Sequence, residues 1–195
     1  EASFYKSPTD MGVNRAGFAI TNDDITKEAS KQEIIRRYFR YRCEYAMGFS
    51  DKETVQRVEL FLNDFNLKPE DRRVVLPARQ AAQEAVERNR GNEGIFCGAA
   101  IELADGSIIT GSNSPLMHAA SSVVIHAIKH LADIPNKIKL LPPNITDSIR
   151  KLKTEILDEK NVSLDLEEAL IALAISATTN PAAELALEKL KELQN

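Results

Sequence analysis

Residues Ile95–His130 read IFCGAAIELADGSIITGSNSPLMHAASSVVIHAIKH, and the other predicted elements are arranged around this stretch. An Asp-Gly pair between two apolar runs is a strong signal for a β-hairpin, because both residues tolerate the positive φ angles of a tight turn. A polar loop and a helix with few charges follow the hairpin. The predicted elements are a strand over Ile95–Leu103, a two-residue turn at Asp105-Gly106, a strand over Ser107–Gly111 and a helix over Ala119–Asp133.

The chain before the hairpin is predicted to be helical. Residues 1–22 show no helical period, whereas Asp24–Met47 carries apolar residues at helical spacing. Ser50 and Glu53 match a capping box that opens a second helix, and a third covers about Val74–Arg90 with Pro77 in its first turn.

After the hairpin, the pattern predicts one more short strand and three more helices. The strand is Lys137–Leu141, which Pro142-Pro143 would end. The helices are Thr146–Leu157, the almost wholly apolar Leu166–Thr178, and a last helix with Asn180 as its cap and Pro181 in its first position.

Charged residues are distributed unevenly along the 195 residues. The net charge is −4, but residues 1–90 hold 16 basic and 15 acidic residues, whereas residues 91–195 hold 9 and 14. Together with the turn residues Gly91-Asn92, this split predicts an N-terminal loop and helical subdomain over 1–91 and a second subdomain over 92–195.

The order of the predicted elements gives the expected fold class, which is α/β. We expect a helical subdomain followed by a small cytidine-deaminase-like subdomain built on the hairpin.

Composition favours a soluble, cytoplasmic protein without membrane or nucleic-acid partners. No apolar run reaches the roughly 18 residues that cross a bilayer, and the net charge argues against nucleic acid, whose binders usually carry a basic field. The two cysteines, Cys43 and Cys97, exclude a disulfide framework and a four-cysteine zinc site. We interpret both as reduced core residues.

The order of elements allows a direct test for zinc-dependent deamination. Such enzymes need His-x-Glu at one helix start and Pro-Cys-x-x-Cys at the next. Here His118-Ala119-Ala120 stands at the first place and residues 143–147 read PNITD, so the proton-shuttling glutamate and both thiolates are missing. His126 and His130 have the spacing of a two-histidine metal face, but Ala127 replaces the glutamate of a zinc-protease helix. We therefore predict no metal site.

Two segments are candidates for contact with a ligand, which we expect to be a nucleotide or another phosphate compound. One is the polar loop Lys6–Asn14; the other is the serine-rich start of the helix after the hairpin, where free N–H groups attract anions. A basic run on the first long helix adds possible phosphate contacts. An ordinary loop, a solvated helix face, and capping with core packing are the alternatives. The candidate ligand-binding residues are Lys6, Ser7, Thr9, Asp10, Asn14, Arg36, Arg37, Ser112, Asn113, Ser121 and Ser122.

Four segments together resemble a known family, the bacterial domain-of-unknown-function 1846 family, in its C-terminal half. They are Tyr5–Asn14, Glu28–Tyr38, Asp105–Gly111 and Ala169–Ala177. The resemblance implies a fold similar to the cytidine deaminases, no established activity, and no catalytic residue or cofactor to carry over. It also implies a fragment that lacks an N-terminal half with a phosphate-binding loop and stops short of the C-terminus.

Two functions follow as the main hypotheses, beside a less favoured third, a metal-dependent hydrolase that would use His118, His126 or His130. In the first, the chain contributes half of a nucleotide or phosphate site shared with the missing N-terminal half of the same protein. In the second, the chain is a structural domain without catalysis, whose exposed apolar helices form a homo-oligomer interface. The apolar segment Leu166–Ala177 motivates the second hypothesis.

Overall fold

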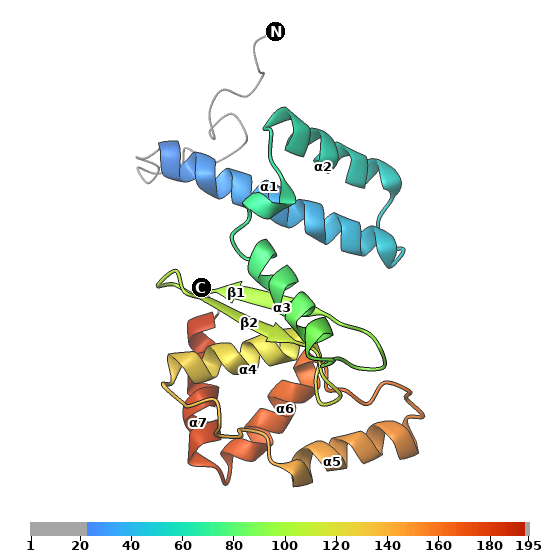
Figure 1. The fold of residues 1–195 in the computed structure, drawn as a ribbon, viewed down its shortest axis with the longest axis vertical. Coiled ribbons are helices and arrows are strands. Elements are labelled where there is room, and N and C mark those ends of the chain that lie inside the picture. Colours follow the sequence, from blue (N-terminus) through green and yellow to red (C-terminus); the bar gives the residue numbers. More distant parts are fainter. Residues whose placement is uncertain (1–22, 194–195) are drawn as a thin grey trace. The chain divides into compact units, whose positions relative to one another are not determined.

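The structure, a computed structural model, describes residues 23–193, which divide into two compact units. The first unit ends at Arg72 and the second begins at Arg73. This division lies well before the expected boundary near Gly91, because the helix from Val75 to Glu87 belongs with the hairpin. The fold class is α/β, as predicted, with many helices and a single two-stranded antiparallel sheet in the described part of the chain (Figure 1).

The first unit is built from two helices, α1 (Asp23–Ala46) and α2 (Lys52–Asp64), and a short 3-10 turn, η2 (Pro69–Asp71). The two predicted helices are confirmed. Ile35 of α1 is completely buried. The cap of α2 is Asp51, whose side chain accepts a hydrogen bond from the N–H of Thr54 at 2.6 Å, so the prediction of Ser50 as the cap is wrong by one residue.

The second unit is organised around the hairpin of β1 (Gly98–Glu102) and β2 (Ile108–Ser112), which confirms the central prediction. The strands pair with Gly98 opposite Ser112 and Ala99 opposite Gly111. Successive residues of a strand point to opposite faces, so Gly98 and Gly111 face opposite sides of the sheet. An added Cβ at Gly98 would meet α3 (Val75–Glu87), and one at Gly111 would meet α4 (Ala119–Leu131). The hairpin is therefore enclosed between these two helices, each seated on a glycine.

The turn of the hairpin differs from the prediction in its geometry. Gly106 has a φ of +82°, but Asp105 is not among the residues with positive φ. The N–H of Leu103 donates to the oxygen of Ser107, and the N–H of Gly106 donates to the oxygen of Leu103, both at 2.9 Å. This is a three-residue loop with glycine in the left-handed position, rather than a two-residue turn.

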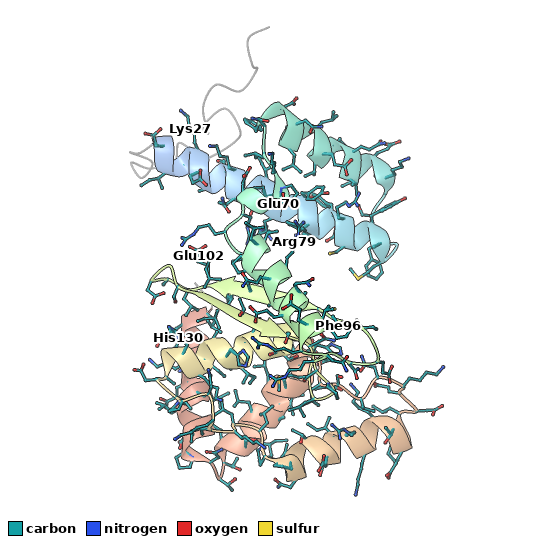
Figure 2. The ribbon with its side chains drawn as sticks, in the orientation of Figure 1. Lys27, Glu70, Arg79, Phe96, Glu102 and His130 are labelled. Carbon is teal, nitrogen blue, oxygen red and sulfur yellow. The ribbon has the colours of Figure 1, made fainter. Side chains whose placement is uncertain are left out.

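The side chain of Arg73 holds this arrangement together at one end. Arg73, just before α3, forms an ion pair with Glu102 at the end of β1 and also donates a hydrogen bond to the oxygen of Gly106 at 3.2 Å. Glu102 is labelled beside the hairpin in Figure 2. The start of α3 is thereby tied to the hairpin turn.

The main hydrophobic core lies between α4, α6 (Leu166–Ala177) and α7 (Pro181–Glu188), with α5 (Pro143–Lys151) and the π-helical turn η3 (Leu152–Ile156) beside it. A 3-10 turn, η4 (Lys189–Leu193), follows α7. The residues of the core that are buried and larger than alanine are Ile125, Ile128, Leu140, Leu141, Leu164 and Leu173.

The predicted strand Lys137–Leu141 is wrong. The segment consists of turns and irregular backbone, and its two leucines are both buried in the core. Adjacent residues of a strand point to opposite faces, so a strand would direct only one of the two leucines into this core. An irregular backbone allows both to be buried in it. Asn180, the predicted cap of the last helix, accepts hydrogen bonds from the N–H groups of Ala182 and Ala183 as expected.

Between residues 23 and 193, no helix has both the length and the apolar character needed to cross a membrane.

Candidate functional site

Two cavities of the second unit lie at opposite ends of α4. The first, which we call the α4-start cavity, has a volume of about 270 Å³. It is bounded by the loop before β1, the end of β2, the start of α4 and the segment before α6. Its lining residues are Asn92, Ile95, Cys97, Asn113, His118, Ala119, Asn161 and Ser163.

The helix that opens into this cavity begins without a side-chain cap. His118 occupies the cap position in an extended conformation, with φ −67° and ψ 162°, but its side chain makes no capping hydrogen bond. The first bond of the helix runs from the N–H of Ser122 to the oxygen of His118 at 2.9 Å. No described residue accepts a hydrogen bond from the N–H groups of Ala119, Ala120 or Ser121. The helix therefore begins with three N–H groups that have no acceptor among the described residues, and with the positive end of its dipole. Of the three residues, Ala119 lines the cavity and Ser121 is completely buried.

The imidazole of His118 is held in one tautomer by Asn161. The Oδ1 atom of Asn161 accepts a hydrogen bond from the N–H of Ser163 at 3.1 Å, which leaves Nδ2 facing Nε2 of His118 at 3.0 Å. An amide nitrogen only donates, so Nε2 accepts and the ring proton lies on Nδ1. The ring of His118 thus carries an N–H donor at Nδ1.

Asn113 fixes the opposite wall. Its Oδ1 accepts from the N–H of Cys97 at 2.8 Å, and its Nδ2 donates to the oxygen of Ile95 at 2.9 Å. This clamp holds the segment before β1 against the end of β2. Cys97 itself is exposed, as is Cys43, so the prediction that both are core residues is wrong. Cys97 precedes the region of β1 that α3 covers and instead lines the cavity.

The serines that the sequence singled out have other roles. Ser121 is completely buried and donates from Oγ to the oxygen of Leu164 at 3.1 Å. Ser122 is buried and Ser112 is half-buried, and neither lines the α4-start cavity. Of the candidates near this helix, Asn113 alone lines the cavity.

The remaining candidates are placed elsewhere. Lys6, Ser7, Thr9, Asp10 and Asn14 lie outside the described residues. Arg36 and Arg37 belong to α1, where both pair with Glu33 at 2.6 and 2.9 Å. The hydrogen bond from Arg36, with a further bond from Arg37, outweighs partial burial and lowers the pKa of Glu33 from 4.5 to about 2. The two guanidinium groups are thus partly neutralised within their own helix.

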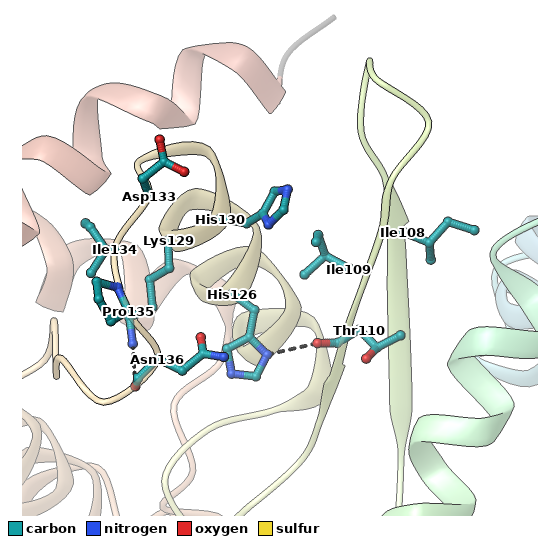
Figure 3. A pocket seen from close by; sticks show the side chains of 10 residues that line it. All are labelled: Ile108, Ile109, Thr110, His126, Lys129, His130, Asp133, Ile134, Pro135 and Asn136. Carbon is teal, nitrogen blue, oxygen red and sulfur yellow. Dashed lines mark hydrogen bonds between the residues drawn. The ribbon is translucent and has the colours of Figure 1, made fainter.

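The second cavity, which we call the Lys129 pocket, lies toward the C-terminal end of α4 and has a volume of about 620 Å³ (Figure 3). Nδ1 of His126 lies 2.8 Å from the oxygen of Thr110, an acceptor, so Nδ1 carries the proton. Lys129 is only 6% exposed and donates from Nζ to the oxygen of Asn136 at 2.9 Å. The lining residues are Ile108, Ile109, Thr110, His126, Lys129, His130, Asp133, Ile134, Pro135 and Asn136.

Sequence reasoning missed Lys129 and Asn161. Lys129 had a detectable signal, because it lies four residues after Ile125, on the face of the helix that the apolar period predicts to be buried. Asn161 stands in a polar segment without a motif and had no such signal. The paired histidines His126 and His130 do lie together, but no cluster of three or more metal-ligating side chains occurs among residues 23–193.

Comparisons with known proteins identify the family. Residues 70–195 match the model of "Domain of unknown function DUF1846, C-terminal", and residues 1–66 match that of "Domain of unknown function DUF1846, N-terminal". A "UPF0371 protein" of Clostridium botulinum (strain Alaska E43 / Type E3) is 53% identical over 192 residues, 98% of this chain. A "UPF0371 protein" of Clostridium tetani (strain Massachusetts / E88) is 47% identical over 194 residues. The chain spans 38% of the length of each of these relatives.

These matches correct one expectation from the sequence. The chain was expected to fall within the C-terminal half of the family, with the N-terminal half as a missing partner. That expectation is wrong, because the first 66 residues match the model of the N-terminal domain. Both matched regions together cover nearly all of the sequence, and the chain belongs to the DUF1846 family.

Proposed function

We propose that the second unit binds a small ligand through a phosphate group at the start of α4. The observation that carries this proposal is the uncapped helix start, with three free N–H groups, beside a cavity lined by His118 and Ala119. A helix N-terminus of this kind favours anions through its donors and its dipole together. His118 lines the cavity and carries a further N–H donor at Nδ1.

The size of the α4-start cavity limits what it encloses. Pockets that enclose a whole drug-sized ligand usually measure about 300–1,000 Å³, whereas this cavity measures about 270 Å³. It suits a phosphate group, and the rest of a nucleotide or sugar phosphate would extend beyond it. In this proposal the contacts come from backbone N–H groups, because Oγ of Ser121 is already bonded to Leu164. The contribution of residues 6–14 and of Arg36 and Arg37 stays a prediction.

The test is to cap the helix with an internal anion. We expect His118→Asp to occupy the free N–H groups and to stabilise the protein by about 0.5–2 kcal/mol, as good N-caps do. The same variant should bind inorganic phosphate at least about tenfold more weakly, as measured by amide shifts of Ala119, Ala120 and Ser121 in NMR titrations.

The matched control is His118→Asn, which caps the same donors without a charge and should weaken phosphate binding less than the aspartate does. Because both variants are expected to be at least as stable as the native chain, loss of binding cannot come from unfolding. Equal phosphate affinity in the native chain and His118→Asp, or no amide shifts at the start of α4, would refute the proposal.

The cytidine-deaminase-like fold of residues 92–195 is likewise a proposal. Its support is the hairpin that leads directly into α4, together with the cavity at the start of that helix. His118 stands where such enzymes carry a zinc ligand, but Ala120 stands where they need a glutamate as proton shuttle. We therefore propose ligand binding at this position and not deamination.

Assembly with a second copy of the chain is a second candidate function. Ile171 and Ile175, one turn apart on α6, are 58% and 48% exposed. We expect self-association that depends on concentration in sedimentation velocity, and its loss when both isoleucines become lysine. The double variant Gln80→Lys with Gln83→Lys, at exposed positions on α3, adds the same charge; it is the control and should leave association unchanged. A native chain that remains monomeric at every concentration would contradict this candidate.

A further inference from the structure

The second unit contains two buried lysines, and they differ in their hydrogen-bond and ion-pair partners. Lys153 is 4% exposed and has two carboxylates within reach, Glu168 at 2.8 Å and Glu159 at 3.3 Å. Lys129 is 6% exposed, but its only partner among the described residues is the backbone oxygen of Asn136. An ammonium group buried without a counter-charge costs several kcal/mol, and such groups commonly lose their proton instead.

The surroundings of Lys129 shift its protonation equilibrium toward the neutral amine. Burial lowers the pKa of its amine below the usual range for lysine. For Lys153, burial acts in the same direction, but the hydrogen bonds and charges of Glu168 and Glu159 outweigh it and raise the pKa. A neutral amine donates one hydrogen to Asn136 and keeps a lone pair for another partner. Desolvated lysines of this kind serve as nucleophiles toward carbonyl compounds.

The Lys129 pocket has room for such a compound and holds groups that move protons. Its volume of about 620 Å³ lies within the range of small-molecule sites. His126 and His130 lie one turn apart on α4 and line the same pocket (Figure 3). Since Nδ1 of His126 donates to Thr110, its Nε2 is the atom available to accept a proton.

We infer that Lys129 is the amine of a carbonyl-binding site and forms an imine with a small aldehyde or ketone in this pocket. The lone pair of Nζ attacks the carbonyl carbon, a C–N bond forms, and a proton moves from nitrogen to oxygen to give the carbinolamine. The C–O bond then breaks, and the hydroxyl leaves as water with a proton delivered by an imidazolium, His126 or His130. The imine nitrogen gives up its remaining proton to the imidazole, so no oxidant or reductant is consumed.

This site is separate from the α4-start cavity, with which it shares no lining residue. The test of imine formation at Lys129 is therefore independent of whether phosphate binds at the start of α4. Saturating the protein with inorganic phosphate should leave the reaction of Lys129 unchanged if the phosphate binds only at the start of α4.

The experiment is reductive trapping on the native chain. The protein is incubated with pyruvate, and separately with acetaldehyde, in the presence of cyanoborohydride, and modified lysines are located by peptide mass mapping over time. We expect Lys129 to acquire the adduct at least about tenfold faster than any other lysine with at least one of the two probes. Lys153, buried but paired, and the exposed Lys137 and Lys139 serve as controls within the same molecule.

Two further variants sharpen the result. Lys129→Met should abolish the fast adduct, and His126→Gln should slow its formation while leaving the exposed lysines unaffected. If Lys129→Met does not fold, the peptide map of the native chain still decides the question. Modification of Lys129 no faster than that of Lys137 and Lys139 with both probes would overturn the inference.

Discussion

Gly98→Ala and Gly111→Ala are each expected to lower the free energy of unfolding of the second unit by about 2–4 kcal/mol. An added Cβ at Gly98 would lie 2.0 Å from the oxygen of Ala78 and 2.6 Å from the nitrogen of Ala82. At Gly111 it would lie 2.4 Å from the nitrogen of Val123. Overpacking in a core usually costs about 1–3 kcal/mol. These clashes involve helix backbone, which cannot rotate away as a side chain does, so we expect costs at the upper end or above.

The control is Gly94→Ala, and the measurement is urea unfolding followed by circular dichroism. Gly94 has a φ of +76° but no atom within 4 Å of an added Cβ, so only the left-handed backbone is strained, at about 1–2 kcal/mol. The two sheet glycines should cost clearly more than this control. Equal costs at all three positions would show that α3 and α4 move away from the hairpin at little expense, and the account of the enclosed sheet would fail.

The glycine positions also show how far the sequence predicts this fold. Strong local patterns predicted the hairpin, α1 and the cap of α7, because turn chemistry, helical period and capping are written within a few residues. The seating of α3 on Gly98 has no local signature, since it depends on contact between segments about 20 residues apart. For that reason charge and turn residues indicated a boundary near Gly91, whereas packing assigns α3 to the second unit.

The segment Lys137–Leu141 illustrates a second limit. Its short apolar run before two prolines is compatible with a strand, but a strand needs a partner, and in the described chain the sheet has only two strands. Leu140 and Leu141 are instead buried in the core together with residues of α6 and α7. The sequence predicted that these two leucines would be buried. The backbone conformation in which they are buried depends on tertiary packing, which the sequence pattern does not reveal.

The same distinction applies to the candidate site. The position at which α4 begins was predictable from the sequence, and the proposal of an anion site there depends only on that position. Which groups surround it was not predictable. Asn161 hydrogen-bonds to His118 although the two are 43 residues apart, and the hydroxyl of Ser121 donates to the backbone oxygen of Leu164. Residue type identified the helix terminus, whereas long-range contacts decide which side chains remain available there.

Lys153 provides the second large effect, through its buried ion pair with Glu168. Nζ of Lys153 donates to Glu168 at 2.8 Å and to the backbone oxygen of Ser163 at 3.1 Å. Glu168 also accepts from the N–H of Asp165 at 2.9 Å in the capping box of α6. This network joins η3 to the start of α6. Removing one partner of a buried pair typically costs about 3–5 kcal/mol, because the remaining charge is left without compensation.

We therefore expect Glu168→Gln to lower the free energy of unfolding by about 2–3 kcal/mol, less than the full range because Glu159 still faces Lys153 at 3.3 Å. Lys153→Met should cost less, about 1–2 kcal/mol, since the carboxylates it leaves behind are more exposed than the lysine and are hydrated. Urea unfolding of both variants and of the double variant gives the coupling between them. If the buried charge of Lys153 depends on Glu168, the double variant should lose less free energy of unfolding than the two single variants lose in sum. Strict additivity would mean that Lys153 is not held by Glu168, and the contrast between a paired Lys153 and an unpaired Lys129 would then lose its basis.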